Sequence, residues 1–481
     1  MRHPIPSKVI DRLKAAAGNG GFIDDPDAIE PYVTDERDLY HGVTPLVLRP
    51  ATTAAVAEIV TICAAAGVGV VPQGGNTGYC GGSVPRPGDD AGGGEIVLSL
   101  ARLNRVRAVD AANHTLTVEA GCVLADVQAA ADDAGLMFPL SLGAEGSCQI
   151  GGNLSTNAGG VQVLRYGNAR DLVLGLEVVL PDGRVLEALR GLRKDNAGYD
   201  LKQLFLGAEG TLGVITAAVL KLYPKPRETA TAMVALADAA AATALLARLR
   251  AASGDAVSSF EYLNRACLEL VVEYIAGARD PFARPYADYA VVELAGGDGT
   301  AEIAEAALGE AIEAGEAADA VVAASVGQAA ALWRLRELIP EAQKRAGGSI
   351  KHDVAVPLSR IPEFLARGAA AALKAVPGAR IVAFGHIGDG NIHFNLSPPA
   401  VTSQGGDVAA FLAQADAVER PIHDLAVALG GSFSAEHGIG VLKKPEMARY
   451  KSAVELDLMR TLKRALDPNG IMNPGKVVDG G

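Results

Sequence analysis

Two glycine-rich stretches constrain the fold of this chain most: residues 72–85 (PQGGNTGYCGGSVP) and 142–160 (LGAEGSCQIGGNLSTNAGG). In such loops successive backbone N–H groups can bind phosphate oxygens, and glycine allows close approach of the backbone to a ligand. One glycine-rich loop is more often a structural turn, but two that also carry Asn, Ser and Thr favour a phosphate-bearing cofactor. Neither stretch has the pattern of a P-loop, and no G-x-G-x-x-G opens a helix as a dinucleotide-binding Rossmann unit requires.

The segment before the first glycine-rich stretch predicts a β-α-β unit. Residues 45–50 and 68–75 have the pattern of strands, and residues 51–67 between them that of a helix, which Thr52 or Thr53 can cap. Further elements are predicted downstream: strands at 96–100, 105–110 and 115–120, a helix near 123–135, a hairpin over 176–189 that turns at Pro181-Asp182-Gly183, and a strand over 211–226. The prolines that close this last strand favour a domain boundary near residue 226.

The pattern changes after this boundary. From 228 to 330 apolar strands such as 289–296 alternate with Ala-rich helical runs at 236–252 and 301–317, which suits a small antiparallel sheet with helices on one side. The remainder predicts a helix over 331–345, a strand over 349–357, a helix over 358–375 and a C-terminal helical segment. At 481 residues the chain is too long for one core. We therefore expect a globular α/β protein with two to three domains.

The composition excludes several classes of protein. A formal charge of −13 argues against nucleic acid or an anionic membrane as the main partner. The five cysteines include no C-x-x-C pair, so we interpret them as reduced thiols and exclude a cysteine–zinc site. The sequence shows no apolar signal region and no charge-free run of about 20 apolar residues, so we expect a cytoplasmic protein without an integral membrane segment.

Residues 385–395 (GHIGDGNIHFN) place two histidines seven residues apart. Asp-Gly between apolar residues predicts a two-residue hairpin turn, which would set His386 opposite His393 with Cβ atoms about 5 Å apart. This is a distance at which both rings can bind one metal ion, although two purely structural histidines remain the alternative. Asn395 falls on the same face of the hairpin. The residues of opposite parity can pack into a core: Ile387, Ile392 and Phe394.

Seven stretches follow one another along the chain in a distinctive order: PQGGNTG at 72–78, SCQIGGNLSTNAGG at 147–160, RYGNARD at 165–171, GAEGTLGVIT at 207–216, GHIGDGNIHFN at 385–395, AEHGIG at 435–440 and LDPNGIMNPGK at 466–476. As a set they resemble the FAD-linked oxidase family of the vanillyl-alcohol oxidase and p-cresol methylhydroxylase type. Within it they are most similar to the D-2-hydroxyacid dehydrogenases, first those that oxidise D-2-hydroxyglutarate and second those that oxidise D-lactate. The resemblance extends from about residue 40 to residue 478.

The resemblance implies a domain organisation and a cofactor. It implies an FAD-binding domain of two α+β subdomains over 1–226, with its core from about residue 40. An α+β substrate domain with an antiparallel sheet and the histidine hairpin follows over 227–430, and a C-terminal helical segment over 431–481 returns to the flavin. The first loop has no histidine that could tether the flavin, so non-covalent FAD is implied.

The resemblance also assigns cofactor contacts by position. The first loop holds the pyrophosphate through Pro72, Gln73, Gly74, Gly75, Asn76, Thr77 and Gly78. The second loop lines the other side of the cofactor through Gly143, Ser147, Gly151, Gly152, Asn153, Ser155, Thr156, Asn157 and Gly159. Gly210 and Ile215 contact the adenine half, and Asn473 closes over the flavin.

In this context His386, His393 and Glu436 form the three-ligand set of an open divalent-metal site, with Zn²⁺ favoured and Mn²⁺ or Fe²⁺ as alternatives. The metal would act as a Lewis acid and lower the pKa of the substrate hydroxyl group. His437 is the natural general base while C2 of the substrate loses a hydride to flavin N5. Glu436 and His437 can serve one site only if the chain bends, which Gly438 favours.

Arg336 and Lys351 correspond to substrate-carboxylate binders of the family, with surface cations as the alternative, and Asn395 can donate to the same substrate. Pro340 is a departure, because the hydroxyglutarate enzymes carry a threonine at this position and proline has no side-chain donor. This departure keeps lactate-, glycolate- and malate-like substrates open. The matches SCQIGG at 147–152 and KHD at 351–353 still favour D-2-hydroxyglutarate.

The expected reaction is therefore oxidation of a D-2-hydroxy acid, first D-2-hydroxyglutarate to 2-oxoglutarate and second D-lactate or glycolate to the corresponding 2-oxo acid. A flavin-binding scaffold with an inactive site is the alternative from another functional class. The sequence shows no nicotinamide motif, so an electron-transfer flavoprotein or a quinone is the expected electron acceptor. A homodimer is left open.

Overall fold

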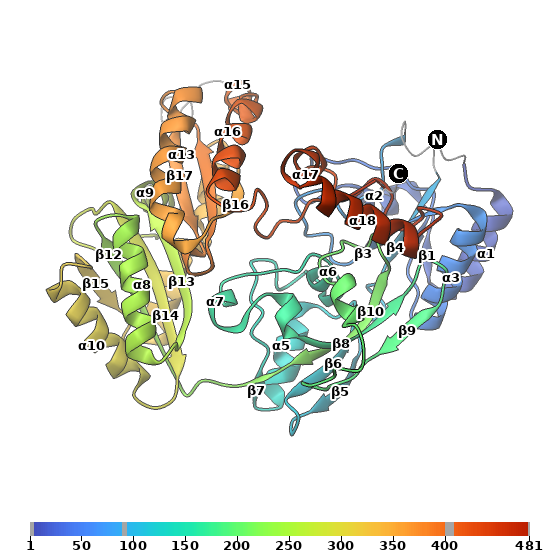
Figure 1. Ribbon diagram of the computed structural model, residues 1–481, viewed down its shortest axis with the longest axis horizontal. Helices are drawn as coiled ribbons and strands as arrows, with labels where there is room; N and C mark the ends of the chain where they lie inside the picture. The colour runs from blue at the N-terminus through green and yellow to red at the C-terminus, as the bar shows by residue number, and fades with distance from the viewer. Residues whose placement is uncertain (1–3, 89–93, 400–407, 480–481) are drawn as a thin grey trace. The chain divides into compact units, whose positions relative to one another are not determined.

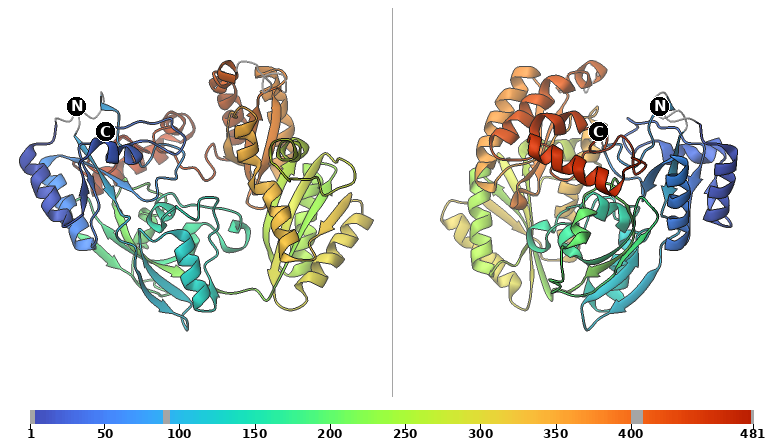
Figure 2. Two further views of the ribbon diagram at one scale, coloured as in Figure 1. Left: turned by 180° about the vertical axis from the view of Figure 1, so that it is seen from behind. Right: turned by 45° about the vertical axis from the view of Figure 1, so that its right-hand side comes forward.

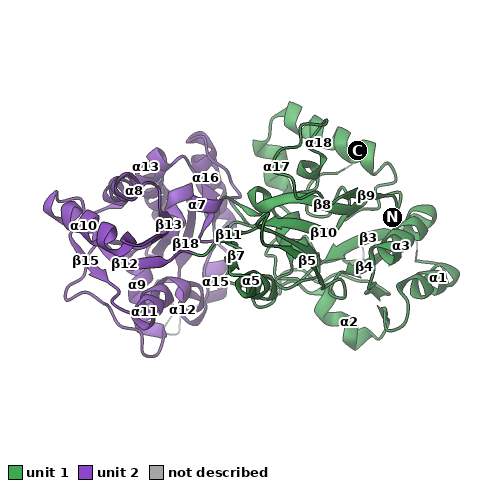
Figure 3. Ribbon diagram, turned by 90° about the horizontal axis from the view of Figure 1, so that it is seen from below, with its two compact units in different colours: residues 1–159, 167–225, 436–481 green, residues 160–166, 226–435 purple. Residues whose placement is uncertain are grey.

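The computed structural model describes residues 4–88, 94–399 and 408–479 (Figure 1, Figure 2). These residues form two compact units (Figure 3). Unit 1 comprises residues 1–159, 167–225 and 436–481, and unit 2 comprises residues 160–166 and 226–435. None of the helices in the described part of the chain combines the length and hydropathy that a membrane span requires.

Unit 1 contains a four-stranded sheet in the order β1-β2-β4-β3, with the strands β1 (Phe22–Ile23), β2 (Val47–Leu48), β3 (Gly69–Gln73) and β4 (Glu95–Ser99). The predicted β-α-β unit is confirmed by β2, α3 (Thr53–Ala66) and β3, although β2 and β3 both pair in parallel with β4 instead of with each other. The Thr52 side chain caps α3 by accepting a hydrogen bond from the Ala55 amide (3.2 Å), and Gly67 ends the helix in the left-handed region.

A five-stranded antiparallel sheet completes the framework of unit 1, in the order β5-β6-β10-β8-β9. Its strands lie close to the predicted positions: β5 (Val106–Asp110), β6 (Thr115–Glu119), β8 (Val173–Val179), β9 (Val185–Ala188) and β10 (Val214–Lys221). The strands β7 (Leu136–Met137) and β11 (Tyr223–Pro224) form a separate two-stranded antiparallel sheet. Before its C-terminal segment the unit also contains the helices α1 (Ser7–Ala17), α2 (Pro26–Val33), α5 (Leu124–Asp133), α6 (Ile150–Ser155), η1 (Ala169–Leu172) and η2 (Leu201–Leu204).

The C-terminal segment belongs to unit 1. It forms α17 (Lys444–Tyr450) and α18 (Ala453–Leu466), which confirms the predicted helical segment. Ser452 and Glu455 form a capping box at the start of α18, with each side chain bonded to the backbone amide of the other. After α18 the chain forms a parallel bridge between Met472 and Val70 of β3, and Figure 2 shows this last segment beside the N-terminal elements of the unit.

Unit 2 is built on a seven-stranded antiparallel sheet in the order β15-β12-β14-β13-β17-β18-β16. Its strands are β12 (Glu228–Leu236), β13 (Val257–Asn264), β14 (Asp288–Gly296), β15 (Asp319–Val322), β16 (Asp353–Ala355), β17 (Arg380–Gly385) and β18 (Asn391–Ser397). Its helices are α7 (Val163–Tyr166), α8 (Ala239–Ser253), α9 (Arg265–Tyr274), α10 (Thr300–Glu313), α11 (Val326–Glu337), α12 (Ile339–Arg345), η3 (Leu358–Arg360), α13 (Ile361–Ala375), η4 (Ile387–Asp389), α15 (Val408–Leu412) and α16 (Ala415–Ala428).

Helices cover both faces of this sheet, so the prediction of helices on one side is wrong. Alternate residues of β12 belong to two separate cores. Ala232 and Val234 belong to the core that also contains residues of α8, α10, α13 and α16, whereas Met233 and Ala235 belong to the core that contains residues of α9, α11 and α12. Figure 1 shows α8 and α10 over one of these faces. A strand that is apolar on both faces must be covered on both, and this overrides the alternation typical of a half-exposed sheet.

The helix predicted over 331–345 is divided into α11 and α12 at Leu338. Pro340 lies in the first turn of α12, where its missing N–H costs no helical hydrogen bond. Inside a continuous helix the same residue would clash with the preceding turn, so the proline determines where the second helix begins.

The predicted two-residue hairpin is also wrong. The register of β17 and β18 pairs Phe384 with His393, so His386 does not oppose His393. The connection instead contains the turn η4, and the Asp389 carboxylate accepts a hydrogen bond from the Asn391 amide (3.1 Å). A third strand, β16, pairs with β18, and the amide of the next residue, Val356, donates to the Gly390 carbonyl (3.0 Å) and so holds this longer loop.

The predicted burial of Ile387, Ile392 and Phe394 is nevertheless confirmed, since all three are fully buried. The ring of Phe394 packs against the ring of Phe364 with 5.6 Å between centroids, and Gly368 of α13 lies directly over it. These contacts place Phe394 at the centre of the core between β18 and α13.

We predict that Phe394→Ala lowers the free energy of unfolding by about 3–5 kcal/mol, because it removes a ring from a closed core. Unfolding of unit 2 in urea, followed by the fluorescence of Trp333, measures the change in this free energy. Val326→Ala is the control, since Val326 is 88% exposed and its truncation should change the free energy of unfolding by less than about 0.5 kcal/mol. Equal effects of the two substitutions would contradict the assigned core.

Candidate active site

The two glycine-rich loops of unit 1 pack against each other. A Cβ atom placed on Gly75 would lie 2.2 Å from the Ser147 carbonyl oxygen, which no side chain can tolerate. A Cβ atom on Gly74 would lie 3.4 Å from the Gln149 Cβ atom. The glycines of the first loop are therefore required for backbone-to-backbone contact with the second loop.

Two amide side chains of the first loop hold the loop itself. Gln73 is buried, and its Nε2 atom donates to the carbonyls of Tyr32 (2.9 Å) and Ser83 (2.9 Å). Asn76 has a φ of 55° and donates to the Thr34 carbonyl (2.8 Å). Pro72 and Gln73 end β3, Thr77 is half-buried, and Gly78 has open space where a side chain would be.

The second loop leads into α6, which carries Gly151, Gly152 and Asn153. Gly151 packs against the Ala120 Cβ atom at a distance that excludes a side chain (2.8 Å from a Cβ position), whereas Gly143 and Gly152 have open space there. Three polar side chains of this loop form local hydrogen bonds. Ser147 donates to the Ala144 carbonyl, Thr156 donates to the Gly152 carbonyl, and Asn157 accepts from the Arg170 amide. Ser155 is half-buried and Gly159 is buried.

Asn473 joins this arrangement from the C-terminal segment. Its Nδ2 atom donates to the carbonyls of Gly82 (2.8 Å) and Glu209 (2.7 Å), and its buried Oδ1 atom has no hydrogen-bond partner among the described residues. Gly210, with a φ of 71°, packs on Pro72 at 3.1 Å from a Cβ position, and Ile215 is buried in β10. Open glycine positions and an unused buried acceptor fit a bound cofactor that has its own N–H groups.

The catalytic candidate His437 lies in the chain segment that follows Ala435. Gly438 adopts a φ of 76° and supplies the expected bend. The His437 ring meets the Tyr79 ring edge-on with 5.0 Å between centroids, and its Nε2 atom lies 4.0 Å from the Glu436 Oε1 atom. The two neighbouring side chains can therefore act on one group of atoms.

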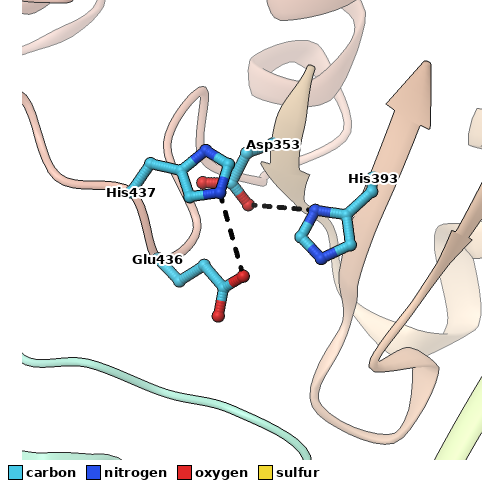
Figure 4. Close-up of side chains that lie close together, drawn as sticks. All are labelled: Asp353, His393, Glu436 and His437. Atoms are coloured by element: carbon cyan, nitrogen blue, oxygen red, sulfur yellow. Dashed lines mark ion pairs between the residues drawn. The ribbon is translucent and has the colours of Figure 1, made fainter. Parts of the chain in front are cut away.

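Four side chains offer ligand atoms that all lie within 4.8 Å of one another: Asp353, His393, Glu436 and His437 (Figure 4). Asp353 of β16 pairs directly with His393 of β18, and the two side chains approach to 3.9 Å. The Ala435 amide donates to the Asp353 carbonyl (3.3 Å), so chain connection alone brings Glu436 near. Sequence reasoning missed Asp353, although a carboxylate in the KHD stretch of a predicted strand was a signal.

His386 is absent from this group of four but remains close to it, with 5.6 Å between its ring centroid and that of His393. Its Nδ1 atom lies 2.6 Å from Glu261 Oε1. Glu261 is fully buried and also accepts a hydrogen bond from Arg336 Nε (2.8 Å). Burial alone would raise the pKa of Glu261, but the positive charges of His386 and Arg336 lower it to about 2. Sequence reasoning also missed this carboxylate.

The proposed substrate binders differ in exposure. Arg336 is buried, with its guanidinium 4.7 Å from the Phe384 ring centroid, so the surface-cation alternative is wrong for it. Lys351 is exposed. Asn395 is buried, and its side chain donates to Gln343 Oε1 (3.0 Å) and accepts from the His352 amide (3.1 Å). Its contact with a substrate stays a prediction.

Comparisons with known proteins agree with the two-part organisation of the chain. A family model described as "FAD binding domain" matches residues 44–189, and one described as "FAD linked oxidases, C-terminal domain" matches residues 225–477. Among solved structures, p-cresol methylhydroxylase with substrate bound superimposes with a TM-score of 0.76 at 17% identity, covering 98% of this chain and 97% of that one. An alkyldihydroxyacetonephosphate synthase gives a TM-score of 0.73 at 18% identity, covering 98% and 85%. These likenesses establish the fold.

Sequence relatives are much closer. The D-2-hydroxyglutarate dehydrogenase of Xanthomonas citri pv. viticola is 42% identical over 434 residues, which cover 90% of this chain and 89% of the relative. The mitochondrial D-2-hydroxyglutarate dehydrogenase of Bos taurus is 40% identical and covers 95% and 81%. A putative mitochondrial D-lactate dehydrogenase of Schizosaccharomyces pombe is 36% identical and covers 94% and 85%. With two matching family models and relatives of this identity along nearly its whole length, the chain belongs to the FAD-linked oxidase family.

Proposed function

We propose that this protein is an FAD-dependent dehydrogenase that oxidises D-2-hydroxyglutarate to 2-oxoglutarate. The group formed by Asp353, His393, Glu436 and His437 carries the proposal, because two imidazoles and two carboxylates within 4.8 Å suit both metal binding and proton transfer. The names of the relatives at 36–42% identity support the substrate class. FAD, when bound, supplies the acceptor for the two electrons of the reaction.

We further propose a divalent metal ion, Zn²⁺ first, held by His386, His393 and Glu436. Metal-bound histidines commonly donate their second ring nitrogen to a carboxylate, and Glu261 stands in this position at His386 Nδ1. Asp353 is a fourth candidate ligand in the same group. A bound cation of this kind lowers the pKa of a coordinated hydroxyl group.

The roles of the protein side chains follow from these positions. His437 takes the proton of the substrate hydroxyl as the C2 hydrogen leaves with its electron pair, so that the C2–O bond becomes a carbonyl. Arg336 and Lys351 bind carboxylate oxygens of the substrate, and Asn395 donates a further hydrogen bond. Because Glu261 already holds Arg336 Nε, the terminal nitrogens of Arg336 are the ones that face a substrate in this proposal.

D-lactate is the second candidate substrate. Pro340 lies at the start of α12 and offers no side-chain donor for a distal carboxylate, which favours a substrate with a single carboxylate. A relative named as a putative D-lactate dehydrogenase belongs to the same set of matches.

We propose an electron-transfer flavoprotein or a quinone as the electron acceptor, and the cytoplasm as the location, although the eukaryotic relatives are named mitochondrial.

Anaerobic flavin bleaching tests the reaction. We expect purified protein to be yellow, with an absorbance band near about 450 nm that D-2-hydroxyglutarate removes in the absence of oxygen. D-lactate, added separately, decides between the two candidate substrates by the rate of bleaching. Flavin that dithionite reduces but that neither hydroxy acid reduces would leave the protein a flavin-binding scaffold.

Gly75→Ala tests the glycine-loop contact. A methyl group at this position would meet the Ser147 carbonyl oxygen, so the loops must separate at a cost of roughly 1–3 kcal/mol and the FAD content should fall. Gly309→Ala is the control, because Gly309 lies in α10 of unit 2, away from both loops, and open space surrounds its Cβ position. The FAD-to-protein absorbance ratio after gel filtration measures the effect, and equal FAD content in both variants would contradict it.

His386→Ala and His393→Ala test the metal ligands. Each should abolish bound metal and cut turnover by several orders of magnitude, while FAD content stays unchanged because the glycine loops belong to unit 1. Metal analysis by mass spectrometry and anaerobic reduction rates measure both effects, with Phe394→Ala as the control that keeps its metal. Metal loss in the His393 variant alone would replace His386 by Asp353 in the ligand set, and full metal content in both variants would remove the proposed site.

A further inference from the structure

We infer that Glu209 is a positioning residue whose carboxylate holds the backbone that follows Glu436 and His437. This inference rests on the proposed function, in which these two residues bind the metal and take the proton. Glu209 belongs to the GAEG stretch, of which only Gly210 was assigned to the cofactor by resemblance. The sequence pattern alone does not indicate that the Glu209 side chain has a role different from that of the neighbouring glycines.

Both carboxylate oxygens of Glu209 accept hydrogen bonds from the chain just after His437. Oε1 accepts from the Ile439 amide (2.7 Å) and Oε2 from the Gly440 amide (2.8 Å). Such bonds to an ionised acceptor are stronger than those between neutral groups. Partial burial raises the pKa of Glu209, and the two amides and Lys443 oppose that rise. Both oxygens of the side chain therefore bond to the backbone of residues 439 and 440, just after His437.

The backbone of Glu209 is held equally firmly. Its φ of 51° lies in the left-handed region, which is uncommon for a residue other than glycine. Its amide donates to the Ser155 carbonyl (2.8 Å), and its carbonyl accepts from Asn473 Nδ2 (2.7 Å). Ser155 and Asn473 are both residues assigned to the flavin. The segments assigned to the cofactor therefore hold the main chain of Glu209. The side chain of Glu209 holds residues 436–440, which we call the catalytic segment.

The segment that follows His437 is closely packed within unit 1. A Cβ atom on Gly438 would lie 2.9 Å from Glu209 Oε1, and one on Gly440 would lie 2.0 Å from the Cys80 carbonyl oxygen. The Cys80 carbonyl also accepts a hydrogen bond from the Val441 amide (2.8 Å). The segment thus lies between Glu209 and Cys80, and the position of the His437 ring against Tyr79 depends on both.

The physical consequence is kinetic. A misplacement of a catalytic group by about 1 Å can lower the rate about 100-fold, whereas groups that bind the substrate elsewhere are unaffected. Glu209→Gln keeps the size of the side chain but can accept only one of the two amides, and its own NH₂ group faces the other. It should therefore lower kcat with little change in KM, since Arg336 and Lys351 belong to unit 2.

The test compares Glu209→Gln, Glu209→Asp and wild-type holoenzyme with D-2-hydroxyglutarate, with rates expressed per bound flavin. We expect kcat to fall about 100-fold in the Gln variant, KM to stay within about threefold, and Zn²⁺ affinity after dialysis to fall about tenfold. Glu209→Asp keeps two acceptor oxygens on a shorter side chain and should recover part of kcat. Asp35→Asn is the control for the change from carboxylate to amide, because Asp35 accepts from the amides of Leu39 and Tyr40 in the same unit through Oδ1 alone, and its kcat should be unchanged.

Three outcomes decide the inference. Wild-type kcat per bound flavin in Glu209→Gln, together with an inactive His437→Asn variant, would overturn the positioning role and leave the proposed function intact. A loss of activity in Glu209→Gln that matches its loss of FAD would also overturn it, because Glu209 would then act only through cofactor binding. Full activity of His437→Asn would instead overturn the proposed base, and with it the reason to position this segment.

Discussion

The backbone contact between Gly75 and the Ser147 carbonyl oxygen is the constraint on which unit 1 depends. Because a Cβ position on Gly75 lies only 2.2 Å from that oxygen, the first glycine-rich loop can approach the second only without a side chain. The same approach leaves Gly78, Gly143 and Gly152 facing open space. A space lined by backbone is what a large cofactor with phosphate groups needs, so the packing of the two loops creates the cofactor site as it closes the fold.

Two carboxylates organise the polar groups around the candidate active site. Glu261 holds the Arg336 guanidinium and the His386 ring in unit 2, and Glu209 holds the amides of Ile439 and Gly440 in unit 1. Burying a charge is unfavourable unless hydrogen-bond partners compensate it, and each carboxylate has partners on both oxygens. Neither residue need touch a substrate for its removal to disturb the groups that do.

Local patterns in the sequence determined the elements of the fold. The strands β2 to β6 and β8 to β10 and the helix α3 follow from apolar periodicity and from the Thr52 cap, which act within a few residues. The burial of Ile392 and Phe394 in one core follows from alternation along β18, whereas Ile387 lies in the turn η4. The two glycine loops and the set of motifs also sufficed to identify the family, because their order and spacing are properties of the sequence itself.

Only the tertiary structure decided which side chains meet. The Asp-Gly pair predicted a two-residue turn, but pairing of β18 with β16 fixed a longer loop, so that His393 faces Asp353 in place of His386. The partners of Glu261 and Glu209 lie 75 to 231 residues away in the chain, beyond any local pattern. Periodicity specifies the face on which a residue lies, whereas its neighbour across a sheet or a loop depends on the register and packing of segments that the sequence does not place side by side.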